Sequence, residues 1–192
     1  MQRTRTAILD AALDCLATQG VRRTTMTDLA VVGGIAKATL YNHFRTKEGV
    51  LRYYGEHLRE QVEAGLLLLG PEASPLERIR AVLQTMAAES ELHREEARIV
   101  YRCSSGDPSD LASPTPARRR ILELMTQAVR EAQEAGLARR DLPAEETGFL
   151  VAGMLQMATL AVVLGGRTAE SMVDVTWQFI LGGIRGESKM AP

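Results

Sequence analysis

Apolar residues at three- and four-residue spacing run through most of this 192-residue chain, and they constrain its fold more than any other feature. Glycines interrupt the spacing at positions 20, 33–34, 70, 136 and 165–166, where helices commonly end. No segment sustains the apolar–polar alternation of a half-buried strand, and no Asn-Gly or Asp-Gly hairpin turn occurs. The sequence therefore predicts an all-α protein of about nine helices.

Capping signals fix several of the expected helix starts. Thr25 precedes Asp28 by three residues, and Ser74-Pro75-Leu76-Glu77 places Ser at the N-cap, Pro at the first position and Glu at the third. Thr46 is expected to cap a long helix that ends before Gly70-Pro71. The predicted helices cover roughly residues 4–19, 25–32, 37–44, 47–69, 75–89, 92–102, 117–135, 143–164 and 168–184, with a loop at 104–116.

Charge divides the chain unevenly. Its formal net charge is only −1, but residues 1–60 carry nine Lys or Arg against six Asp or Glu, so an acidic body follows a basic head. This division favours a polyanionic partner for the head. The charged N-terminus shows no secretory pattern, and the two cysteines, Cys15 and Cys103, have no metal-ligand spacing. A cytoplasmic protein without a membrane span or cofactor is expected.

The stretch from Gly33 to Lys47 predicts a helix-turn-helix. A helix from Thr25, a glycine turn and a second helix from Lys37 have the order of this motif. On the second helix, Leu40 and Phe44 are expected to face the core, which leaves a polar face for the major groove of DNA. Lys47 begins the following helix, where free backbone N–H groups favour a phosphate. The expected DNA-contacting residues are Thr25, Lys37, Ala38, Thr39, Tyr41, Asn42, His43 and Lys47.

The segment from Ile8 to Leu51 resembles the DNA-binding domain of the tetracycline-repressor (TetR) family of transcriptional regulators. The resemblance rests on spaced motifs: Ile8-Leu9-Asp10-Ala11-Ala12, Gly20, Thr24-Thr25, Lys37-Ala38-Thr39-Leu40-Tyr41-Asn42-His43-Phe44 and Thr46-Lys47-Glu48. It implies DNA binding by residues 1–48 and a helical ligand-binding and dimerising domain over residues 49–192. Two positions depart from the family pattern: Ala36 stands where a capping Ser is usual, and Ala38 where Gly is usual.

The resemblance also implies a homodimer, a palindromic operator and a small-molecule effector. The residues of the body suggest where the effector binds and where the dimer forms. An apolar cavity for a small hydrophobic molecule is expected among Met86, Tyr101, Arg102, Met125, Gln156 and Met157. The last two helices are the expected dimer interface, through Phe149, Met154, Val173, Trp177, Ile180 and Ile184. The alternatives are an intrachain core at these positions, and a regulator that binds DNA constitutively.

Other functions are less consistent with the sequence. Glu89, His93 and Glu96 have helical spacing, but within the charged run ESELHREEAR they are more typical of a solvated face than of a metal site, so no metal is expected. The three histidines are scattered and no phosphate-binding loop occurs, which argues against an enzyme. A helical interaction protein would explain the body but not the polar residues between Lys37 and Lys47.

Overall fold

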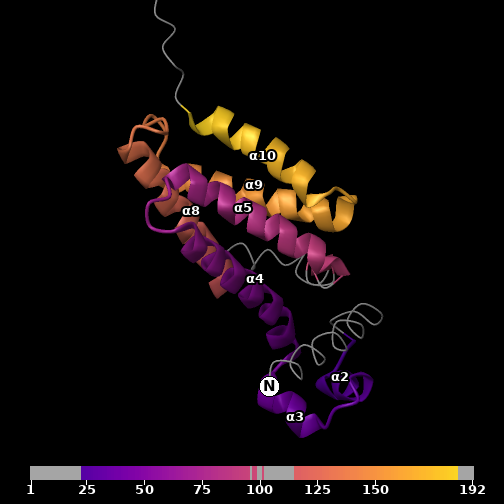
Figure 1. The fold of residues 1–192 in the computed structure, drawn as a ribbon. Helices are drawn as coiled ribbons and strands as arrows, with labels where there is room; N and C mark the ends of the chain where they lie inside the picture. Colours follow the sequence, from indigo (N-terminus) through magenta and orange to yellow (C-terminus); the bar gives the residue numbers. More distant parts are fainter. Residues whose placement is uncertain (1–22, 96, 99–100, 102–114, 186–192) are drawn as a thin grey trace, which may run out of the picture. The chain divides into compact units, whose positions relative to one another are not determined.

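A computed structural model describes residues 23–95, 97–98, 101 and 115–185. Within these ranges the structure gives the bounds of seven α-helices and shows no strand, so the all-α prediction is confirmed. The helices are α2 (Met26–Val32), α3 (Lys37–His43), α4 (Lys47–Leu69), α5 (Pro75–Leu92), α8 (Pro116–Glu134), α9 (Ala144–Gly165) and α10 (Ala169–Ile184) (Figure 1). The helix expected at 4–19 lies outside the described residues.

The predicted capping residues make the hydrogen bonds that their positions require. The Thr25 and Ser74 side chains each accept from the backbone N–H three residues on, and the carboxylates of Asp28 and Glu77 return to the cap backbone. Thr46 Oγ1 accepts from Gly49 N over 3.1 Å and caps α4. Gly34, between α2 and α3, has φ +58°, a conformation that costs glycine little and other residues more.

Contacts divide the described residues into two compact units. One contains residues 23–56 and the described part of 95–101, and the other contains residues 57–94 and 115–185. The boundary falls inside α4, between Glu56 and His57, later than the expected end of the DNA-binding domain at residue 48. The short segment after residue 94 joins the first unit, which the sequence did not suggest.

The second unit is built on packing among α5, α8, α9 and α10 (Figure 1). Its core includes Ile79 and Leu83 of α5, Met125 of α8, Leu155 of α9 and Ile180 of α10, each no more than 1 % exposed. Val62 brings the later part of α4 into the same cluster. Leu76, Leu124 and other half-buried residues surround this core.

Helix α9 is long and apolar enough to cross a membrane by length and composition alone. It packs against α5, α8 and α10, but only one side of it is buried. The other side is exposed: Phe149, Leu150 and Met157 are each at least 60 % exposed. An exposed apolar face of this kind is typical of a surface that binds another molecule.

Candidate functional site

The α2–α3 segment presents a polar face above a buried anchor. Leu40 is fully buried and Phe44 is 4 % exposed, and the Phe44 ring meets that of Tyr53 edge-on with centroids 5.8 Å apart. On α2, Leu29 and Ala30 are buried as well. These contacts fix the rotation of α3 about its axis, which decides which side chains reach solvent.

The exposed side of α3 contains several of the predicted DNA-contacting residues. Lys37, Ala38, Tyr41 and Asn42 are exposed, whereas Thr39 and His43 are half-buried. Arg45 follows the helix and is also exposed. Together these side chains offer a cation, hydroxyls and an amide, which are groups that bind phosphates and base edges. Their common exposure on one short helix is consistent with the predicted groove-binding face.

Thr25 is committed to a structural role at the start of α2. Its hydroxyl donates to Asp28 Oδ2 over 2.7 Å and accepts from Asp28 N over 3.2 Å, and its N–H donates to the same carboxylate over 2.8 Å. The hydrogen bond from the hydroxyl and that from the backbone hold the pKa of Asp28 below its usual value. Because the hydroxyl is the donor in this cap, a phosphate contact by Thr25 would compete with the capping box.

The N-terminal ends of α3 and α4 lie beside this polar face. Helix α3 has no side-chain cap at Ala36, as expected, so its first N–H groups lack the partner that a Ser would supply. Lys47 is the first residue of α4, next to the capping residue Thr46, but its side chain lies outside the described part. Its predicted phosphate contact stays a prediction that rests on its helix position.

The family models match both parts of the chain. The model for bacterial regulatory proteins of the tetR family matches residues 8–54, and a model for tetracyclin repressor-like C-terminal domains matches residues 72–184. The chain belongs to the TetR family. The second match extends the sequence resemblance, which ended at Leu51, through the helical body, and members of this family are transcriptional regulators rather than enzymes.

Individual proteins also match parts of the sequence or the whole fold. The nucleoid occlusion factor SlmA of Vibrio atlanticus (strain LGP32) is 36 % identical over 101 residues, which are 50 % of each protein. The HTH-type transcriptional repressor KstR2 of Mycolicibacterium smegmatis is 30 % identical over 111 residues, 56 % of this chain and 52 % of that protein. The chain thus spans about half the length of these relatives. The regulator FadR of Bacillus subtilis, solved in complex with stearoyl-CoA, superposes with a TM-score of 0.76 at 16 % identity over 93 % of this chain and 98 % of that one, which shows the fold.

The predicted effector residues lie in different environments. Met86 and Met125 lie together in the buried core cluster. Tyr101 is half-buried, and Gln156 accepts a hydrogen bond from Arg118 of α8 over 2.9 Å. Met157, in contrast, is 61 % exposed and does not belong to the buried core, so its contact with an effector stays a prediction. Arg102 lies outside the described residues.

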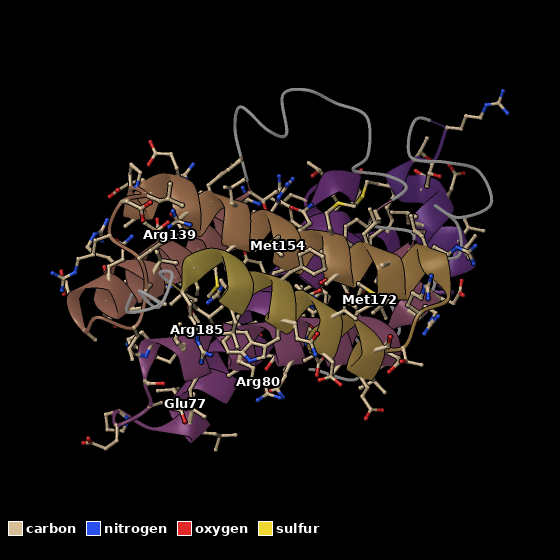
Figure 2. The ribbon with its side chains drawn as sticks, turned by 90° about the horizontal axis from the view of Figure 1, so that it is seen from above. Glu77, Arg80, Arg139, Met154, Met172 and Arg185 are labelled. Atoms are coloured by element: carbon tan, nitrogen blue, oxygen red, sulfur yellow. The ribbon has the colours of Figure 1, made fainter. Side chains whose placement is uncertain are left out.

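The predicted dimer residues are divided between the core and the surface of the single chain. Phe149 is exposed, but Val173, Ile180 and Ile184 are buried in the core of their own chain. Two others are half-buried. Met154 packs against the core, and Trp177 lies under Arg80 of α5, with the guanidinium carbon 5.9 Å from the ring centroid. Figure 2 shows Met154 on α9 and Arg80 on α5. The outward apolar face consists instead of Phe149, Leu150, Met157, Leu164, Val175 and Phe179.

One cluster of potential ligands was missed by the sequence. Glu89 and His93 come together as expected from their spacing, but the third member is His57 of α4, whereas Glu96 lies outside the described part. Glu89 and His93 are both half-buried beside His57. Only packing of α4 on α5 could reveal this, because His57 is 32 residues from Glu89.

Proposed function

We propose that this TetR-family regulator is a repressor that binds a palindromic operator as a homodimer and leaves it when a small hydrophobic molecule binds. The observation that carries the DNA-binding part is the exposed polar face of α3 above buried Leu40 and Phe44. A helical interaction protein would have no use for a short helix that exposes Lys37, Tyr41 and Asn42 together. A DNA target also requires a cytoplasmic location.

The direct test is footprinting on the region upstream of the protein's own gene. A discrete protected site with two half-sites about one helical turn, or 34 Å, apart is expected. Asn42→Ala should abolish or relax protection, because an exposed amide on the recognition helix reads base edges. Arg185→Ala at the exposed end of α10 serves as the matched control and should protect as the wild type does. Protection without sequence preference would refute operator recognition.

The proposed dimer rests on the outward apolar face of α9 and α10. These two helices pack against each other. Leu150, Met157 and Leu164 recur every seven residues along α9, Val175 and Phe179 are four residues apart on α10, and Phe149 adjoins Leu150. Phe149 and Phe179 are 60 % and 70 % exposed in the single chain. A second copy that applies the same face would bury both, and a four-helix contact of this kind brings two α3 helices to one operator.

The proposed effector is an apolar organic molecule that enters the body near Met86 and Met125. Support comes from the apolar character of the core between α5 and α8, and from the fold shared with a FadR protein solved with stearoyl-CoA. A shallow hollow at the end of α8 is lined by Arg130, Gln133, Glu134 and Arg140, none of which belongs to the predicted set. The competing hypothesis is constitutive DNA binding.

Linkage separates these two hypotheses. An inducer that releases the operator must itself bind less tightly when the operator is present, by the same factor, typically 5–150-fold. Stearoyl-CoA and a free long-chain fatty acid should therefore be titrated calorimetrically with and without operator. Equal affinities in both titrations would show that the tested molecule is not the effector.

A further inference from the structure

We propose that His57, Glu89 and His93 form a binding site for a divalent transition-metal ion such as Zn²⁺, which ties α4 to the last turn of α5. The site is independent of the proposed operator and effector. All three residues belong to the second unit of the chain, and their ligand atoms lie within 4.8 Å of one another.

The distances match the edges of a metal coordination shell. His57 Nε2 lies 3.2 Å from Glu89 Oε2, and His93 Nε2 lies 3.8 Å from the same oxygen. Ligand atoms about 2.0–2.1 Å from a tetrahedral Zn²⁺ are about 3.4 Å apart. The two imidazole rings are nearly perpendicular, at 87°, with centroids 5.5 Å apart, so they are not stacked against each other. Small side-chain rotations suffice to bring all three atoms onto one ion.

The three metal-binding side chains come from two helices, α4 and α5. Glu89 and His93 are four residues apart at the end of α5, where side chains of such a pair share one face. His57 comes from the adjoining face of α4 and completes the set. The neighbouring cation Arg94 donates to Glu91 and to the Arg167 carbonyl, so its charge is directed away from Glu89. The carboxylate therefore faces two imidazoles.

The donor set selects the class of metal. Two imidazole nitrogens and one carboxylate oxygen suit Zn²⁺, Co²⁺ or Ni²⁺, whereas Mg²⁺ and Ca²⁺ prefer oxygen ligands alone. The side chains remain 20–38 % exposed, so an ion can enter from solvent and keep a water molecule at its fourth position. Three protein ligands with one open position form a reversible site rather than a closed structural one.

The test uses the full chain without an affinity tag, because a polyhistidine tag would bind the same metals. Co²⁺ should give the visible absorption of a tetrahedral complex with one equivalent bound, Zn²⁺ should displace it, and Mg²⁺ should not. Each of His57→Asn, Glu89→Gln and His93→Asn should weaken Co²⁺ binding by about 100-fold or more. Loss of a residue that only hydrogen-bonds to a metal ligand already lowers metal affinity by about 10–100-fold. Zn²⁺ should also raise the melting temperature of the wild type but not of these variants.

Two controls make the result decisive. The third histidine of the chain is His43, on α3, so His43→Asn should keep full Co²⁺ affinity. Glu60→Gln removes an exposed carboxylate one turn after His57 and should do the same. Circular dichroism establishes whether each variant is folded. If a histidine variant does not fold, the near-isosteric Glu89→Gln still tests whether the site binds Co²⁺. Absence of Co²⁺ binding, or binding that the three variants leave unchanged, would overturn the proposal.

Discussion

Gly148 of α9 lies so close to Thr126 of α8 that a Cβ atom added at position 148 would be 2.5 Å from the Thr126 Cα. The two helix backbones therefore meet without a side chain between them. We predict that Gly148→Ala lowers the free energy of unfolding by about 1–2 kcal/mol, because the cost of overpacking exceeds the gain in helix propensity. Chemical denaturation measures this difference.

Gly65→Ala is the matched control for that prediction. A Cβ at position 65 of α4 would lie 3.1 Å from the Thr85 hydroxyl oxygen, which can rotate away, whereas the Thr126 backbone cannot. Its effect should be within about 0.5 kcal/mol of zero. Equal destabilisation by both substitutions would contradict the close approach of α8 and α9.

Helix α3 should gain stability from the cap that it lacks. We expect Ala36→Ser to stabilise the helix by about 0.5–2 kcal/mol and to tighten operator binding, since less ordering then remains for DNA to impose. Hydrogen exchange of the α3 amides gives the local stability. Ala88→Ser, at an exposed interior position of α5, makes the same chemical change without a cap and should bring no gain.

Lys47 should contribute to DNA affinity regardless of sequence. As the first residue of α4, it is placed to contact a phosphate. Lys47→Ala should therefore weaken binding to all DNA sequences equally. It should also reduce the slope of log binding constant against log salt concentration by about one unit. Lys37→Ala on the exposed side of α3 should instead change which sequence is preferred. A gel-shift series at several salt concentrations separates the two roles, and a changed preference in Lys47→Ala would contradict the assignment.

The outward face of α9 and α10 should determine the oligomeric state. Phe149→Glu combined with Phe179→Glu is predicted to give folded monomers in sedimentation, because both side chains are exposed in the single chain and removing them disturbs no core. Leu67→Glu changes an 82 % exposed residue of α4 and should leave the dimer intact. If the double variant remains dimeric, the interface lies elsewhere.

The ion pair between Arg78 of α5 and Glu131 of α8 should make stability depend on pH. A hydrogen bond from Gln127 lowers the Glu131 pKa below 4.5, burial opposes this, and Arg78 lowers it further. Because the pKa is lower in the folded state, the stabilisation is present above pH 4.5 and is lost as the pH falls through the folded value.

Glu131→Gln should therefore reduce the free energy of unfolding at pH 7 by up to about 1 kcal/mol, the range for partly exposed pairs. The difference from the wild type should shrink as the pH falls below 4.5. Glu134→Gln, an exposed neighbour on α8, should show no such trend in denaturation curves recorded across the same pH series. If the difference in unfolding free energy between Glu131→Gln and the wild type persists at low pH, it comes from the shape of the side chain and not from its charge.

The sequence by itself determined several helix starts and the recognition segment. The caps at Thr25 and Ser74, the turn at Gly34 and the missing cap at Ala36 all depend on groups within a few residues, so local rules suffice. Leu40 was also assigned correctly to the core, because α3 has one apolar and one polar side. The spaced motif around Lys37 then identified the family that both family models match.

Only the tertiary structure decided which apolar residues of α9 and α10 face inward. Both helices are apolar on most sides, so periodicity could not distinguish buried Ile180 from exposed Phe179 or place Met157 on the surface. The same limit hid His57, which reaches Glu89 and His93 only when α4 packs on α5. Such contacts join residues far apart in the chain, and the packing of whole helices against one another determines them rather than any local preference.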